Sequence, residues 1–327
     1  MTRTDSPKSG ILRFRRSVGT LGEQTALLLL WGLICFALCD GALLAKQGRD
    51  ALALCIRQVI PVLFPIAAAG GLLTTLAPPP RIICRPIGRL FRLSDASVGV
   101  LLIALVSGFP IGAMLSSRLL EAGRIGREEA SRLAAYTNNA SAAFLTGCVG
   151  AGFFGSPRLG WILWIASTAA ALIVGIWMAR HAPLPAQTKE REYPLPTSGE
   201  LAKSLKATGL GMLNLTAFVV FFAVFCAFLN RALSVILPPN GITSLVQATV
   251  SAFFEITGGL SAIAGLSLPL SLRMALAGAA AGFGGLSVFM QCMAAGGAVQ
   301  GRQLFFARLA IGVLSGILAL LLTLLLG

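Results

Sequence analysis

Histidine and acidic side chains are scarce in this chain of 327 residues. It has a single histidine, His181, and 12 Asp and Glu residues against 26 Lys and Arg residues. Its seven cysteines form no Cys-x-x-Cys pair and no spacing typical of a metal site. A zinc site or a serine–histidine catalytic triad therefore has little to be built from. We expect the protein not to be an enzyme and to need neither a metal nor a cofactor.

Charge of either sign is also sparse. Charged residues make up 12% of the chain, hydrophobic residues 56%, and the mean hydropathy is +0.84, whereas a soluble domain is about 25% charged. Helices of about 20 apolar residues can cross a hydrocarbon core of about 30 Å. Such apolar segments fall at 24–45, 51–77, 96–115, 134–154, 159–179, 208–237, 242–268, 271–295 and 304–326. The sequence therefore predicts an all-α polytopic membrane protein in contact with the lipid bilayer.

The net charge of +14 is spread over several loops rather than gathered in one patch, which argues against a nucleic-acid partner. Basic clusters between apolar segments are typical of cytoplasmic loops. We expect a cytoplasmic N-terminus and a retained first transmembrane helix within residues 1–50. Two further parts, 51–180 and 208–327, are expected on either side of a cytoplasmic linker at 181–207. Arginines alternate with apolar residues over 81–92, which predicts an amphipathic helix on the membrane surface.

Segment 96–115 lies between two basic loops, which cannot both be cytoplasmic if it crosses the membrane once. A re-entrant helical hairpin resolves this conflict, and "SGFPIGA" at 107–113 offers glycine and proline to break the helix. The alternative is an ordinary kinked helix. At an offset of 174 residues, 107–133 aligns with 281–307, and paired interrupted segments are typical of transporters built from repeats. Chance similarity is the alternative, and an inverted repeat would require 242–268 not to make a simple crossing.

Polar residues inside apolar segments are the candidate functional residues. Glu255 is the one acidic residue deep within the apolar segments of the second half. An acidic residue there could bind a proton or Na⁺, pair with an arginine or hydrogen-bond a broken backbone, and the alternative is a structural cap. "AAYTNNASAAF" at 134–144 contains Thr137, Asn138, Asn139 and Ser141. A helix unwound at 137–141 would offer free N–H groups and amides near the middle of the membrane. We expect Asn138 and Asn139 to face a substrate; the alternative is polar contact between packed helices.

"SGFPIGA", "TNNASAAFLTGCVGAGFFGSP", "FFEITGGL" and "GFGGLSV" occur here in an order and spacing that resembles the YlbJ-type sporulation integral membrane proteins. The resemblance covers residues 50 to 326. It implies a nucleoside-recognition, or Gate, domain and a fold like that of concentrative nucleoside transporters, with re-entrant hairpins and broken helices in two repeat halves. The substrate-binding residues that it implies are Ser107, Gly108, Phe109, Pro110, Asn138, Asn139, Ser141, Glu255, Gly282, Phe283, Gly284, Gly285 and Ser287.

The resemblance also implies transport of a small organic anion, with dipicolinate during sporulation as the leading candidate. Transport would proceed by alternating access around the hairpin tips, in the mother-cell or outer forespore membrane of a bacterium. One alternative is a carrier of nucleosides or other neutral solutes, and another is a membrane scaffold or assembly protein without transport. The coupling ion, H⁺ or Na⁺, and the oligomeric state stay open.

Overall fold

The computed structural model describes residues 24–25, 27–76, 79–185, 198–297 and 299–326. Within these ranges the chain forms helices joined by short turns, with no β-strand. By length and composition, four of the described helices could cross a membrane, or up to six if each bent helix pair counts as one span. The prediction of an all-α polytopic membrane protein is therefore confirmed.

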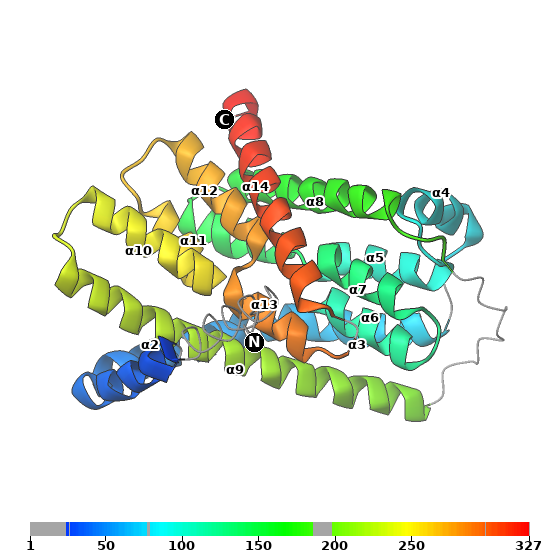
Figure 1. Cartoon of the computed structure of the whole chain (residues 1–327), viewed down its shortest axis with the longest axis horizontal. Coiled ribbons are helices and arrows are strands. Elements are labelled where there is room, and N and C mark those ends of the chain that lie inside the picture. Colours follow the sequence, from blue (N-terminus) through cyan, green and yellow to red (C-terminus); the bar gives the residue numbers. More distant parts are fainter. Residues whose placement is uncertain (1–23, 26, 77–78, 186–197, 298, 327) are drawn as a thin grey trace, which may run out of the picture.

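A helix at Leu27–Cys39 is followed by the labelled elements of Figure 1. Their bounds are α2 (Gly41–Leu54), η1 (Cys55–Val59), α3 (Ile60–Leu76), α4 (Arg81–Phe91), α5 (Asp95–Ser107), α6 (Ile111–Glu121), α7 (Arg127–Thr137), η2 (Phe144–Phe153), α8 (Pro157–Arg180), α9 (Ser198–Ile236), α10 (Gly241–Phe254), α11 (Ile256–Ala264), α12 (Leu270–Phe283), α13 (Gly285–Ala294) and α14 (Gly301–Leu326).

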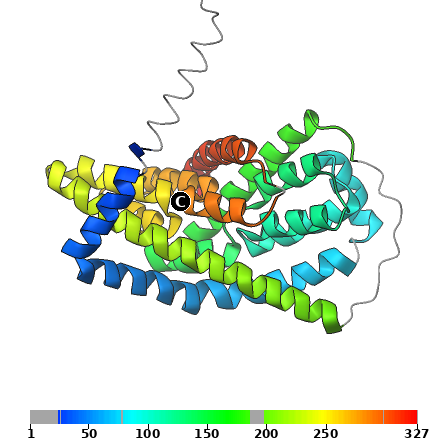
Figure 2. The ribbon, with the colours of Figure 1, turned by 60° about the horizontal axis from the view of Figure 1, so that its bottom comes forward.

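The longest helix, α9, lies along one side of the molecule together with α2, η1 and α3. α2, η1 and α3 follow one another, and both α2 and α3 pack against the 39-residue α9, as Figure 2 shows from below. Asp40 interrupts the predicted first span at 24–45: the helices before and after it meet at 106°. Its carboxylate accepts a hydrogen bond from the Leu43 N–H and so caps α2.

A helical hairpin and a broken helix form the first structural unit. α5 and α6 pack side by side, joined at Gly108, whose φ is +85°. Ile103 of α5 and Leu115 of α6 both lie against Gly70 of α3, which places the two arms next to each other. The chain then runs through α7, unwinds over 138–141, continues as η2 and returns as α8.

A second unit has the same order of elements. α10 and α11 form a hairpin whose tip is Glu255, and their arms approach so closely that a Cβ on Gly259 would meet the backbone of Ala252. The following helix is broken at Gly284 into α12 and α13, and α14 returns alongside α12. A hairpin, a broken helix and a long helix therefore occur twice, in the same order along the chain.

This order corrects the predicted alignment of 107–133 with 281–307. The structural counterpart of the tip at Gly108 is the tip at Glu255, and the counterpart of the 138–141 break is Gly284. The alignment was wrong because the glycines of a hairpin tip and those of a broken helix look alike in sequence. Residues 242–268 form the second hairpin and do not make a simple crossing.

The two units have opposite directions. The side chain of Arg158, at the start of α8, donates to the carbonyl of Leu326, at the end of α14, so these packed helices are antiparallel. Arg127, at the start of α7, donates to the Gly297 carbonyl in the turn just before α14. The starts of α7 and α14 therefore share one end of the molecule, and α12 starts at the other end. Each hairpin lies beside the start of its broken helix, so the two hairpins open toward opposite ends.

We call the end that carries α4 and the turn after α6 the basic end; it lies on the right in Figure 1. α4 is amphipathic, as predicted: Cys84 and Phe91 are buried, while Arg81, Arg85 and Arg89 are exposed. The predicted linker at 181–207 is helical from Ser198 onward because that stretch is the first part of α9. Its residues 186–197, and the N-terminal residues 1–23, lie outside the described part of the chain.

Candidate functional site

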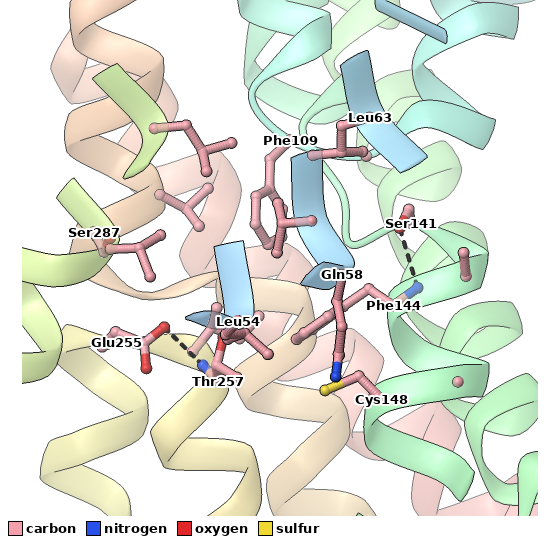
Figure 3. Close-up of a pocket in the computed structure, with 18 of the residues that line it drawn as sticks. Leu54, Gln58, Leu63, Phe109, Ser141, Phe144, Cys148, Glu255, Thr257 and Ser287 are labelled. Carbon is pink, nitrogen blue, oxygen red and sulfur yellow. Dashed lines mark hydrogen bonds between the residues drawn. The ribbon is translucent and has the colours of Figure 1, made fainter. Parts of the chain in front are cut away.

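A cavity of about 460 Å³ lies where both hairpin tips and both helix breaks meet. The close-up in Figure 3 shows Ser141, Phe144 and Cys148 on one side of it, Glu255, Thr257 and Ser287 on the other, and Leu54 and Gln58 between them. We call it the central cavity. Its lining residues are Leu54, Arg57, Gln58, Val59, Leu63, Gly108, Phe109, Ser141, Ala143, Phe144, Gly147, Cys148, Gly152, Phe153, Leu215, Val219, Glu255, Ile256, Thr257, Ser287, Val288 and Gln291.

The first hairpin tip is fastened directly to the first helix break. The Phe109 N–H donates to the Asn139 carbonyl at 2.8 Å, and the Phe109–Pro110 peptide bond is cis. A Cβ on Gly108 would lie 2.9 Å from the Cβ and the backbone nitrogen of Ser141. Glycine is therefore required here both for its positive φ and for this close approach. Gly108 and Phe109 line the cavity as predicted.

Ser141 begins the helix that follows the first break. Its hydroxyl accepts a hydrogen bond from the Phe144 N–H at 3.2 Å, as serine does at a helix N-terminus. Ser141 also lines the cavity, together with Phe144 and Cys148 on the next turn. The unwinding predicted for 137–141 is present from residue 138, since Thr137 is still the last residue of α7.

Asn138 and Asn139 lie behind the cavity wall. Asn138 accepts from the Ala113 N–H at 3.1 Å and donates to the Ala134 carbonyl at 2.5 Å, so its amide joins α6 to α7. Asn139 donates to the Tyr136 carbonyl at 3.1 Å and accepts a hydrogen bond from Arg308 of α14. Neither residue lines the central cavity. Both amides thus make contacts between helices of the kind that the alternative describes.

Glu255 is the tip of the second hairpin and caps α11. Its carboxylate accepts from the Thr257 N–H at 2.9 Å and from the Gly258 N–H at 2.7 Å. The side chain is 4% exposed and lines the central cavity. A carboxylate at a helix N-terminus is stabilised by these N–H groups and by the helix dipole. Glu255 therefore caps a helix, as the structural alternative expects, and its side chain also faces the cavity. Its binding of a proton, Na⁺ or substrate stays a prediction.

The second helix break contributes Ser287 to the cavity, and Gln291 lies one turn further along α13. Two glycines allow the backbone to break here, since Gly284 and Gly285 have φ values of +88° and +80°. Gly282 lies close to Gly312 and Ser315 of α14. Phe283 stacks on Phe253, with 5.6 Å between the ring centroids. These four residues surround the break without lining the central cavity.

Five of the predicted residues thus line the central cavity: Gly108, Phe109, Ser141, Glu255 and Ser287. Ser107 and Thr137 are buried and donate to carbonyls of their own helices, those of Ile103 and Leu133. Pro110 lines a second, smaller cavity. The prediction therefore identified the segments that form the site more reliably than the side chains that face it.

Sequence reasoning missed three polar residues that line the cavity. Arg57 and Gln58 come from η1, and Gln291 comes from α13. The signal was the polar pair in "LALCIRQVIPVLF", because an arginine within an apolar segment is unusual. The described residues contain no group of three or more His, Cys, Asp or Glu side chains that could hold a metal ion.

One curated relative supports the resemblance found in the sequence. The chain is 27% identical over 277 residues to the sporulation integral membrane protein YlbJ of Bacillus subtilis (strain 168). The alignment covers 73% of this chain and 66% of that protein, so the chain spans just under two thirds of the relative's length. No family model matches the chain. No solved structure matches it.

Proposed function

Because the chain is related to the YlbJ-type sporulation integral membrane proteins, we propose that it transports a small organic anion across a membrane. Dipicolinate, made during sporulation, is the leading candidate. We place the basic end in the cytoplasm because short loops rich in Lys and Arg stay on that side. The membrane would be that of the mother cell or the outer membrane of the forespore.

The observation that carries the proposal is the position of the central cavity. It lies between two hairpin tips and two helix breaks that belong to units of opposite direction. Paired interruptions in inverted units are typical of the substrate sites of secondary transporters. A volume of about 460 Å³ also falls within the range of about 300–1,000 Å³ found for sites that bind small molecules.

The lining of the cavity suits a small aromatic acid. Phe109, Phe144 and Phe153 offer apolar faces, and Arg57 offers a guanidinium group that can bind a carboxylate. The carboxylate of Glu255 is already bound to two backbone N–H groups. Arg57 is therefore the group that would attract an anion, and Glu255 would hold the tip of the second hairpin in shape.

A neutral solute is the second candidate, and a specific observation favours it. Gln58, Gln291 and Ser287 also line the cavity and can hydrogen-bond the hydroxyl and amide groups of a nucleoside. Glu255 would then accept a hydrogen bond from the solute instead of repelling a dicarboxylate. Removing the charge of Arg57 distinguishes the two candidates, because transport of an anion depends on that charge and transport of a neutral solute does not.

Uptake by the purified protein in liposomes tests the proposal. Labelled dipicolinate and labelled uridine would each be offered with and without a proton or sodium gradient. We expect dipicolinate uptake, and we expect Arg57→Gln to reduce it at least about tenfold because a lost charge-assisted hydrogen bond costs about 1.5–3 kcal/mol. Arg49→Gln is the matched control, since Arg49 lies on α2 and does not line the central cavity.

Each outcome has a definite meaning. Uridine uptake that Arg57→Gln leaves intact would replace the anion by a neutral solute. Uptake of neither substrate, together with Arg57→Gln and Glu255→Ala proteins that differ only in abundance, would refute transport and leave the scaffold role.

A further inference from the structure

A smaller cavity of about 210 Å³ adjoins the central cavity on the side of the basic end. It lies between α6, α9 and α13. Arg118 and Glu121 come from the last turn of α6, Ala207 from the first part of α9, and Ala294 from the end of α13. All of these positions belong to the basic end. We call it the vestibule.

Two residues line both cavities and separate them: Leu215 of α9 and Gln291 of α13. Leu215 is 3% exposed and Gln291 is 4% exposed, so both side chains are buried where the two cavities meet. The boundary also runs between two adjacent residues, since Phe109 lines the central cavity and Pro110 lines the vestibule. The two cavities are therefore one side-chain layer apart.

Gln291 carries a buried acceptor that the protein does not use. Its Nε2 donates to the Ser287 hydroxyl at 3.2 Å, while its Oε1 has no hydrogen-bond partner among the described residues. Leaving a buried carbonyl oxygen without a partner is unfavourable, because the oxygen has lost its hydrogen bonds to water. The amide stands between the two cavities, where a passing molecule can supply the hydrogen bond.

The vestibule is more polar than the central cavity and carries a cation. Arg118 is the one basic residue that lines it, and Asn214 and Ser117 contribute an amide and a hydroxyl. The Ser117 hydroxyl is buried and also has no hydrogen-bond partner among the described residues. Glu121 lines the vestibule beside Arg118 and offers an acceptor. Arg118, Asn214 and Ser117 can each donate a hydrogen bond to the carboxylate of a small organic anion.

We propose that the vestibule is a second binding site, through which a small organic anion reaches the central cavity from the basic end. Arg118 attracts the anion, and Leu215 with Gln291 forms the barrier that it must pass. The proposal rests on the proposed function, because it treats the central cavity as the destination of a solute.

Cys148 provides a natural reporter, since it lines the central cavity. Replacing the exposed Cys35 and Cys39 by serine leaves only buried cysteines besides Cys148. Inside-out and right-side-out vesicles would be treated with two small thiol reagents, the anionic sulfonatoethyl and the cationic trimethylammonium-ethyl methanethiosulfonates. We expect Cys148 to react faster in inside-out vesicles, in which the basic end faces the reagent.

Two substitutions test the route itself. Asn214→Trp fills the vestibule and should slow labelling by both reagents. Arg118→Gln should slow the anionic reagent about tenfold and leave the cationic reagent unchanged or faster, because a charged cleft raises the arrival rate of ions of opposite charge by about 10- to 1,000-fold. Ala294→Phe fills the same vestibule from α13 in case Asn214→Trp does not fold.

The matched controls are Leu213→Trp, one residue away on an exposed part of α9, and Arg124→Gln in the turn after α6. Neither residue lines either cavity. The proposal would be overturned if Cys148 is labelled at the same rate in the Asn214→Trp and Leu213→Trp variants. It would also be overturned if Arg118→Gln changes the labelling rates of the anionic and the cationic reagent by the same factor. Uptake measured on the unaltered protein separates the two hypotheses: with the expected labelling but without uptake, the route stands and the transport function fails.

Discussion

Arg308 of α14 donates a hydrogen bond to Asn139, with 3.0 Å between its Nη1 and the amide Oδ1. Its Nε donates to the Phe283 carbonyl at 3.0 Å. One guanidinium group, 2% exposed, therefore holds the first helix break and the second together. The amide that the sequence suggests as a substrate ligand is thus a hydrogen-bond partner of a buried cation.

Replacing Asn139 by alanine should destabilise the protein more than it affects the central cavity. The substitution leaves the buried Arg308 without its side-chain acceptor, which costs about 1–3 kcal/mol. Thermal unfolding in detergent, followed by size-exclusion fluorescence, measures the loss. Asn214→Ala is the control, because the structure shows no hydrogen bond from its amide. Equal unfolding temperatures for the two variants would contradict this role for Asn139.

Glu255→Ala should lower both stability and uptake, because the carboxylate caps α11 and lines the central cavity. Loss of a helix cap costs about 0.5–2 kcal/mol. Asp40→Ala is a matched control, since Asp40 caps α2 by accepting from Leu43 at 3.2 Å and does not line the cavity. We expect both variants to unfold at lower temperature and only Glu255→Ala to lose uptake in liposomes. Loss of uptake in both variants would show that any lost cap impairs transport.

Hydropathy and helix-breaking residues were enough to predict the membrane class and the places where helices are interrupted. "SGFPIGA" and "TNNAS" both mark real interruptions, at Gly108 and at 138–141. The register between the two units could not be predicted in the same way. The tip at Glu255 has an acidic cap where the tip at Gly108 has glycine and proline, so the two tips share no residue pattern.

The direction in which each polar side chain points could not be predicted from the sequence either. Asn138 faces α6 while Ser141, three residues later, faces the cavity, and the unwound backbone between them follows no helical period. Arg57 was missed for the opposite reason. It lies in a continuous helical stretch, so no helix-breaking residue marks its position, and the one signal is its charge within an apolar segment.

Gly108→Ala should destabilise the first hairpin tip. The residue has a φ of +85°, and an added Cβ would lie 2.9 Å from Ser141. With a ψ of 177°, Gly108 lies in a backbone region that is essentially restricted to glycine and costs another residue about 1–3 kcal/mol. The contact with Ser141 adds to that cost. Gly126→Ala is the control, because Gly126 has a negative φ and no atom within 4 Å of an added Cβ. Thermal unfolding should separate the two variants; equal stability would contradict the close approach of tip and break.

Thiol labelling in whole cells tests the opposite directions of the two hairpins. Ala122 lies at the end of the first hairpin and Gly265 at the end of the second, and both positions are exposed. Each would be replaced by cysteine in turn. In a background with Cys35 and Cys39 replaced by serine, we expect a membrane-impermeant maleimide to label Gly265→Cys in intact cells. Ala122→Cys should react only after the cells are permeabilised, because we place the basic end in the cytoplasm. Labelling of both positions from the same side would contradict the inverted arrangement. That arrangement rests on the contact between Arg158 and Leu326, which shows that α8 and α14 are antiparallel and that the two units run in opposite directions.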